Sequence, residues 1–132
     1  MGKRKSKPTH QPFESKHSHG RFAKICHDMV DSSAWENLNL RQQGLYLAFK
    51  MRYYQKIENG EVIKSNQNMI KFTKSEALKI YGDYRTFRTD LHVLIDNGFI
   101  HLVESGRPTR TPNLYGFSER WKTIPLKSKQ KK

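Results

Sequence analysis

Residues 73–115 read TKSEALKIYGDYRTFRTDLHVLIDNGFIHLVESGRPTRTPNLY, and their pattern predicts two short helices in succession. The first begins at Thr73. Glu76 follows three residues later, so the two side chains can form a capping box that satisfies backbone amides left unpaired at a helix start. The apolar side of this helix is predicted to be Ala77, Ile80 and Tyr81, and Gly82 ends it.

A second helix is predicted directly after Gly82. Asp83 is suited to cap it, because its carboxylate can accept a hydrogen bond from an early helical amide. The apolar residues then recur with the spacing of a stripe buried against a core, at Phe87, Leu91, Leu94 and Ile95. The sequence Asn97-Gly98-Phe99 predicts a Schellman ending, with Gly98 at positive φ and Phe99 folded back onto Leu94.

Three short strands are predicted around these helices, at residues 69–72, 99–103 and 114–117. The last two flank the loop 106–112, GRPTRTP, which we call the wing. Two helices followed by a strand, a basic loop and a strand are the order of a winged helix-turn-helix. We therefore predict an α+β winged helix-turn-helix, with three main helices, a small three-stranded antiparallel sheet and flexible basic tails.

The chain before Thr73 is predicted to supply the scaffold. Residues 22–25 favour a short first strand, and Ser32 or Ser33 can cap a turn of helix through Ala34 and Trp35. Asn39 with Gln42 marks the start of a longer helix. Its predicted apolar face consists of Leu45, Phe49 and Tyr53, widened by Tyr46 and Met51. Asn59-Gly60 is a turn signal.

Charge divides the chain into a body and two basic ends. The formal net charge is +13 over 132 residues. Residues 1–21 contain six Lys or Arg against Glu14 alone, and residues 122–132 contain five Lys and no acid. Such segments are too polar to join a core, so we predict a disordered arm at 1–20, one domain at 21–122 and a tail at 123–132. The basic balance indicates a polyanionic partner.

Side chains on the polar face of the second helix are the candidate base readers. A recognition helix reads the major groove with residues near its N-terminus, and an Arg fork matches both acceptors of guanine. Arg85 and Arg88 suit guanine, whereas the Thr side chains suit a phosphate or a thymine methyl. The alternative is a solvated polar face without a partner. The candidates are Tyr84, Arg85, Thr86, Arg88 and Thr89.

The wing and the first cap supply further candidates for DNA contact. Arg107, Thr109 and Arg110 are predicted at the wing, where an Arg can enter a narrow A·T-rich minor groove. The alternative is a plain hairpin loop with solvated charges. Lys71, Thr73 and Lys74 are predicted to contact DNA phosphate.

Three segments resemble a known group of proteins: SSAWENLNLRQQGLYLAFKMRYY at 32–54, TKSEALKIYGDYRTFRTDLHVLIDNGFIHLVESG at 73–106 and PNLYGFSERW at 112–121. They look like the winged helix-turn-helix proteins of plasmids, phages and integrative conjugative elements. The resemblance implies a DNA-binding module of the kind found in replication initiators, small regulators and accessory factors of conjugative transfer. Tyr84 stands where small or basic residues are more usual in that group.

Other kinds of site have little basis in the sequence. His17, His19, Cys26 and His27 do not have the spacing of a zinc site, so no metal and no cofactor are predicted. There is no phosphate-binding Gly-rich loop, nucleophile elbow or local carboxylate cluster, so we do not expect an enzyme. A single cysteine favours a reducing compartment, and no apolar run has membrane-spanning length, so we expect a cytoplasmic protein without membrane contact. Trp35 and Trp121 are expected to pack on the core.

The resulting hypothesis is a sequence-specific double-stranded DNA-binding protein of a mobile genetic element. It would act as an accessory factor at an origin of conjugative transfer, or in plasmid replication initiation or its control, with a relaxase or a replication protein as partner. A transcriptional regulator is the first alternative. An RNA-binding or ribosome-associated basic protein is the second, because cationic tails suit RNA equally well.

Overall fold

The computed structural model describes residue 13 and residues 23–126. The predicted N-terminal arm lies outside this part apart from Phe13, and so do residues 127–132 of the predicted tail. Within 23–126 the helices are α1 His27–Val30, α2 Ser33–Glu36, α3 Leu40–Lys50, α4 Lys74–Tyr81 and α5 Tyr84–Asp96. The strands there are β1 Gln55–Glu58, β2 Glu61–Ser65, β3 Ile70–Lys71, β4 Ile100–Glu104 and β5 Leu114–Phe117. Two 3-10 turns complete this part, η1 Arg107–Thr109 and η2 Arg120–Thr123.

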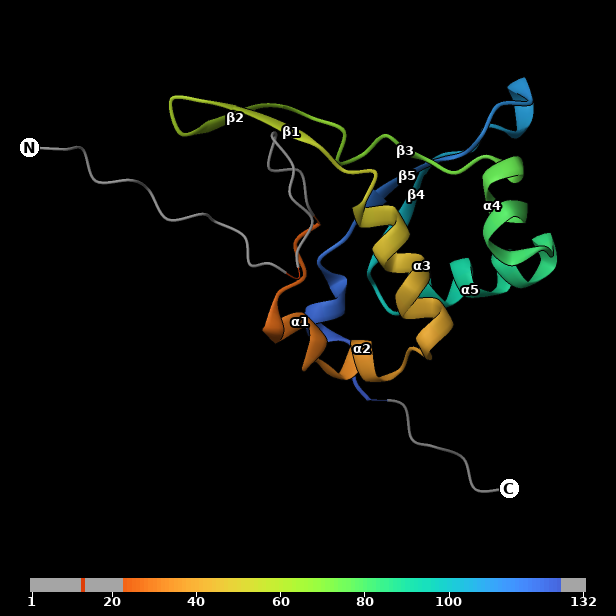
Figure 1. The fold of residues 1–132 in the computed structure, drawn as a ribbon, viewed down its shortest axis with the longest axis horizontal. Helices are drawn as coiled ribbons and strands as arrows, with labels where there is room; N and C mark the ends of the chain where they lie inside the picture. Colours follow the sequence, from red (N-terminus) through yellow and green to blue (C-terminus); the bar gives the residue numbers. More distant parts are fainter. Residues whose placement is uncertain (1–12, 14–22, 127–132) are drawn as a thin grey trace, which may run out of the picture.

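The strands of the described part form two separate antiparallel sheets. β3, β5 and β4 form the small three-stranded sheet that the sequence predicted, with β5 in the middle. Ile70 of β3 and Leu102 of β4 both pair with Tyr115 of β5. β1 and β2 form a hairpin that projects from the body (Figure 1). The α+β class is confirmed, and the hairpin is an addition, since the sequence indicated only its Asn59-Gly60 turn.

The core lies between the three-stranded sheet and the helices α3, α4 and α5 (Figure 1). Large side chains that are fully buried come from several of these elements and the turn after α5: Phe49, Ile70, Leu94, Phe99 and Ile100. Aromatic rings pack between elements, as where Phe49 meets Phe72 at 4.9 Å between centroids. Trp35 and Trp121 are partly buried against this core, as predicted, and the Trp121 ring is stacked on Phe99. Burial of these large apolar groups is the main stabilising contribution.

Helix ends follow the sequence signals closely. Capping boxes are present at Asn39 with Gln42 and at Thr73 with Glu76, and Asp83 caps α5. At the end of α5, the amide of Phe99 donates to the carbonyl of Leu94, and that of Gly98 donates to Ile95, both at 3.0 Å. These are the two bonds of a Schellman motif. Gly98 has a φ of +78°, the left-handed conformation that favours glycine.

Four local expectations need correction. Residues 23–25 are irregular and no described strand pairs with them, so the predicted first strand is wrong over these residues. Ile80 is 54% exposed, because the short helix α4 buries the side that carries Ala77 and Tyr81. Met51 is 59% exposed at the C-cap of α3, and Tyr53 lies beyond the helix end. Ordered contacts also continue past residue 122, since Ile124 packs on the core.

Candidate nucleic-acid interface

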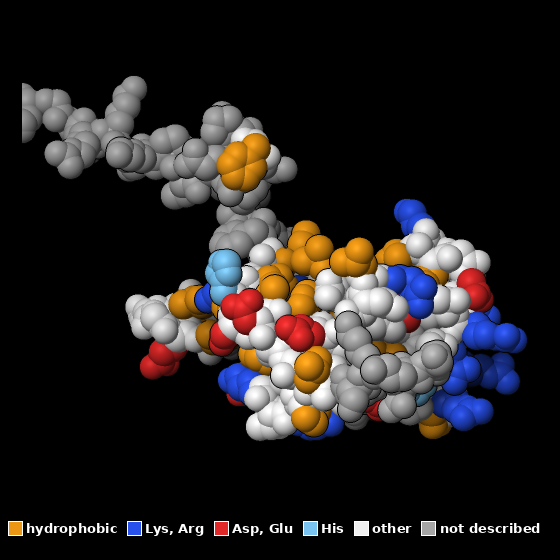
Figure 2. All heavy atoms as spheres, turned by 90° about the horizontal axis from the view of Figure 1, so that it is seen from below, with side chains coloured by type: hydrophobic (Ala, Val, Ile, Leu, Met, Phe, Trp, Pro, Cys, Tyr) orange, Lys and Arg blue, Asp and Glu red, His pale blue; other side chains and the backbone are white. Residues whose placement is uncertain are grey.

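Basic side chains gather at one end of the molecule. In Figure 2 the largest group of Lys and Arg lies at the right-hand end, which in Figure 1 holds α4 and the wing. The wing and the turn between α4 and α5 project from this same side (Figure 1). A surface formed by these elements can therefore present positive charge to a single polyanionic partner.

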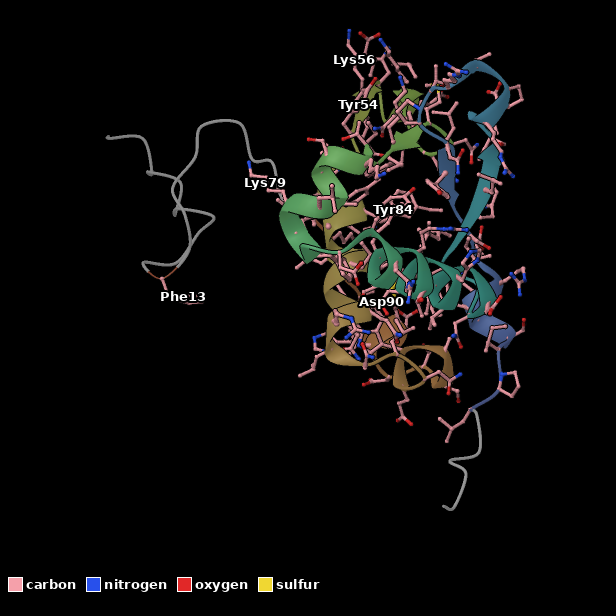
Figure 3. All side chains as sticks on the ribbon, turned by 90° about the vertical axis from the view of Figure 1, so that its right-hand side faces the viewer. Phe13, Tyr54, Lys56, Lys79, Tyr84 and Asp90 are labelled. Atoms are coloured by element: carbon pink, nitrogen blue, oxygen red, sulfur yellow. The ribbon has the colours of Figure 1, made fainter. Side chains whose placement is uncertain are left out.

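The exposed face of α5 lies at the centre of this surface. Figure 3 shows α5 running across it, with α4 at its N-terminal end and β4 leaving its C-terminal end. Side chains of α5 line a shallow hollow of about 350 Å³, formed by Tyr84, Arg85, Arg88, Thr89 and His92. Four of the five predicted base readers thus lie together, whereas the fifth, Thr86, is partly buried and does not line the hollow.

Both threonine hydroxyls of this helix already donate hydrogen bonds, one to the N-cap residue and one within the helix. Thr86 Oγ1 donates to Asp83 Oδ2 at 2.7 Å, and Thr89 Oγ1 donates to the carbonyl of Arg85 at 3.1 Å. The Thr86 hydroxyl and the Arg85 amide lower the pKa of Asp83, so this carboxylate is ionised at neutral pH. Donation to a phosphate would break these bonds. The methyl group of Thr89 remains available for an apolar contact.

The two arginines of the face are available for an external partner. Arg85 and Arg88 are exposed, and their guanidinium groups form no hydrogen bond or ion pair with any described residue. Arg41 and Arg52, by contrast, are bonded to Asp90 and Glu76. A guanidinium without an internal partner keeps its full set of donors for a carboxylate, a phosphate or a base edge.

Tyr84 connects the start of α5 to the start of α4. Its ring is stacked on Phe87, with 5.6 Å between centroids, and the Lys74 ammonium lies 5.3 Å from its ring centroid. The labelled side chain lies between α4 and the strands in Figure 3. This contact places the charge of Lys74 beside the α5 face. Lys71 is exposed at the end of β3, and Thr73, partly buried, accepts a hydrogen bond from the Glu76 amide.

The wing has a closed neck. The carbonyl of Gly106 accepts from the Thr111 amide at 2.9 Å, and the Gly106 amide donates to Asn113 Oδ1 at 2.7 Å. A Cβ atom at Gly106 would lie 1.9 Å from the Thr111 oxygen, so only glycine fits there. Asn113 Nδ2 also donates to the Tyr115 hydroxyl. The neck thus fixes the wing to β5.

The basic residues of the wing lie on and beside its 3-10 turn. Arg107 begins η1, and Arg110 follows it with a φ of +57°. Both are exposed, and neither guanidinium is bonded to a described residue. Thr109 Oγ1 lies 2.9 Å from Thr111 Oγ1, within the wing. At the base of the wing, burial raises the pKa of Tyr115, and the hydrogen bond from Asn113 and the charge of Arg88 on α5 oppose this rise.

A buried carboxylate behind α5 was not anticipated from the sequence. Asp90 has no exposed surface and accepts hydrogen bonds from the side chains of Arg41, Gln42 and Tyr81. Burial raises the pKa of Asp90, but these hydrogen bonds and the Arg41 charge lower it by more, so the carboxyl titrates below its ordinary range. The sequence did carry a signal, because Asp90 interrupts the apolar stripe between Phe87 and Leu91.

Neither a metal-binding cluster nor a membrane-spanning helix is present in the described part of the chain. The residues of this part contain no cluster of three or more His, Cys, Asp or Glu side chains placed to hold a metal ion. His17 and His19 lie outside the described part, and Cys26 is exposed and free. No described helix has the length and apolar character to cross a membrane.

Comparison of the chain with protein family models, with characterised proteins and with solved structures gave no match.

Proposed function

We propose that this protein is a sequence-specific double-stranded DNA-binding protein with a winged helix-turn-helix fold. In this proposal α4 and α5 form the helix-turn-helix, α5 is the recognition helix, and the wing lies beside it. The chain order α3, β3, α4, α5, β4, wing, β5, with the β1–β2 hairpin inserted between α3 and β3, supports the assignment, as does the sheet order β3–β5–β4. The common projection of the wing and the α4–α5 turn supports binding of both to one duplex (Figure 1).

The observation that carries the proposal is the pair of free arginines on α5. Arg85 and Arg88 are exposed in the N-terminal half of the helix, and their guanidinium groups have no hydrogen-bond or ion-pair partner among the described residues. Ordinary surface arginines often pair with a neighbouring carboxylate. The nearest acid to Arg85 in the sequence is Asp83, which is already engaged by Thr86 and the Arg85 amide. A recognition helix uses such N-terminal side chains to read guanine in the major groove.

The remaining candidates take supporting roles in this proposal. Lys71 and Lys74 contact phosphates on one side of α5. Thr73, which lies between these two lysines in the sequence, caps the N-terminus of α4. Arg107 and Arg110 enter the minor groove beside the recognition site, and Thr109 accompanies them. Phosphate contacts fix the position of the protein, whereas base contacts give specificity. Tyr84 and Thr89 add backbone and methyl contacts around the two arginines.

We further propose that the protein acts for a mobile genetic element and is not an enzyme. Its role would be that of an accessory factor at an origin of conjugative transfer, or a factor in plasmid replication or its control. A relaxase or a replication protein would be its protein partner. This part of the proposal rests on the resemblance of residues 32–54, 73–106 and 112–121 to the proteins of such elements.

DNase footprinting across the intergenic DNA next to the gene tests the proposal. We expect one protected site, with competition by unlabelled cognate duplex at least tenfold stronger than by random duplex or structured RNA. Preferential competition by structured RNA would show that the ligand is RNA and not DNA. A protected site that overlaps a promoter would favour the transcriptional regulator, whereas a site at an origin of transfer or of replication would favour the proposed role.

A further inference from the structure

The β1–β2 hairpin, residues 55–65, stands apart from the body of the protein (Figure 1). Every residue of β1 is exposed, as are the first four of β2. In the described part of the chain these two strands pair only with each other. An isolated two-stranded hairpin is marginally stable in water, and an open strand edge offers unpaired backbone groups to another strand. The hairpin therefore has the features of an element that is completed by a partner.

Charges inside the hairpin oppose its own pairing. Lys56 lies directly across from Lys64, and Glu58 lies directly across from Glu61. Like charges at opposed positions destabilise an antiparallel pair. The exception is the pair Lys56–Glu58 along β1, whose charged atoms lie 3.8 Å apart on two well-exposed side chains. An exposed pair of this length contributes little.

The same charges become favourable when β1 pairs with a second copy of itself. In an antiparallel pairing centred on Ile57, Lys56 of one copy lies opposite Glu58 of the other, and Ile57 lies opposite Ile57. The charges of Lys56-Ile57-Glu58 are therefore self-complementary. A two-fold axis between the two Ile57 residues relates two identical Lys56–Glu58 ion pairs, one on each side of the axis. Each copy provides the same patch, as a symmetric dimer requires.

Apolar surface and net charge point to a protein partner at this site and not to DNA. Ile57, Val62 and Ile63 are 53%, 55% and 50% exposed. Residues 55–65 contain two Lys and two Glu, so the hairpin is neutral in a chain of net charge +13. A neutral, partly apolar strand pair lacks the positive charge by which phosphate is bound.

We propose that the chain forms a symmetric dimer by antiparallel pairing of β1 with β1 of a second copy. β1 is the more suitable edge, because the register shift within the hairpin leaves Ile63 of β2 without a partner, and a bulge of this kind disrupts an edge. The hairpin lies away from the middle of α5: in Figure 3 Lys56 is at the top of the molecule and Asp90 is well below it, near the middle of the view. This dimer does not depend on the proposed DNA-binding function.

Charge reversal in the full-length protein tests the dimer without DNA. Sedimentation velocity of the wild type at about 10 to 200 µM should show a concentration-dependent monomer–dimer equilibrium. Lys56→Glu and Glu58→Lys should each weaken the dimer about tenfold or more, because both cross-copy pairs become like-charged. Each substitution also places opposite charges across the hairpin of its own chain, so unfolding of the hairpin would not explain the loss.

Mixing the two variants gives the decisive measurement. Lys56→Glu mixed with Glu58→Lys should restore the dimer as a heterodimer, because every cross-copy pair is again of opposite charge. The matched controls are Lys64→Glu and Glu61→Lys on β2, which make the same charge changes within the hairpin and should leave dimerisation unchanged. A monomeric wild type at 200 µM, a mixture that stays monomeric, or equal losses in the β2 variants would each overturn the proposal.

Discussion

The Asp90 carboxylate and the Arg41 guanidinium form a two-point ion pair that joins α5 to α3. Arg41 donates through Nε and Nη2, the latter at 3.0 Å from Asp90 Oδ1. The Tyr81 hydroxyl, at the end of α4, donates to the same carboxylate at 2.8 Å. A single buried group therefore fixes the proposed recognition helix relative to the two helices that support it.

Removal of this carboxylate should destabilise the fold. Asp90→Ala leaves the buried Gln42 amide and the Tyr81 hydroxyl without their acceptor, so we expect a loss of about 3 kcal/mol in the free energy of unfolding. Urea unfolding measures it. Asp96→Ala removes an exposed acid near the end of the same helix and should change stability by less than about 0.5 kcal/mol. Equal effects of the two substitutions would contradict a structural role for Asp90.

The contribution of Asp90 should also depend on pH. Its pKa is lower in the folded protein than its ordinary value, so the ionised form is favoured by folding. The corresponding stability is fully present above the unfolded pKa of about 3.9 and is lost as the pH falls through the folded pKa. We expect the difference in unfolding free energy between wild type and Asp90→Asn to be constant above about pH 5 and to shrink toward pH 2. A difference that is the same at pH 6 and pH 2 would be inconsistent with this linkage.

Local signals in the sequence were sufficient to predict much of the fold, but they could not predict contacts between residues far apart in the chain. The ends of α4 and α5 were predicted, because Thr73, Asp83 and Gly98 act within one turn of the backbone. The hairpin was missed, because β1 and β2 are exposed and lack the apolar alternation of a half-buried strand. The partner of Asp90 could not be assigned either, since Arg41 is 49 residues away and only the packing of α3 on α5 brings them together.

The candidate site could also be predicted only in part from the sequence. The spacing within α5 was enough to place Arg85 and Arg88 on one exposed face. It could not show that the Thr86 and Thr89 hydroxyls are already engaged, because Ser and Thr bond to caps and to helix carbonyls in some positions and to solvent in others. The neck of the wing depends on Asn113, which the sequence pattern did not single out.

Arg85→Ala and Arg88→Ala should each weaken binding to the cognate site by about 1 to 3 kcal/mol, the usual value of a bidentate base contact. Neither side chain contributes to the core, so the melting temperature should be unchanged. Fluorescence anisotropy with cognate and random duplexes measures the effect, and the loss should be much smaller on random DNA. Lys24→Ala, which removes one exposed charge near α1, is the control. Wild-type affinity in both arginine variants would disprove the assignment of the recognition helix.

Gly106→Ala should displace the wing and leave the helices in place. The added methyl group would lie 1.9 Å from the Thr111 oxygen, so the bonds of Gly106 to Thr111 and Asn113 cannot all persist. We expect a stability loss of about 1 to 3 kcal/mol and weaker DNA binding, with base discrimination by α5 retained. Gly44→Ala, on the exposed side of α3 with no neighbour within 4 Å, is the control. NMR shifts confined to residues 104–115 would locate the change.

The wing arginines should respond to groove width and not to base identity. We expect the double variant Arg107→Ala, Arg110→Ala to lose most affinity at sites with an A·T-rich flank, because a narrow minor groove concentrates negative potential. The recognition-helix variants should instead lose discrimination among the major-groove bases. A binding series that exchanges the flank for G·C pairs around a fixed core site separates the two effects. Equal losses of affinity with both flanks would mean that the wing arginines contact only phosphates. No loss with either flank would mean that the wing points away from the DNA.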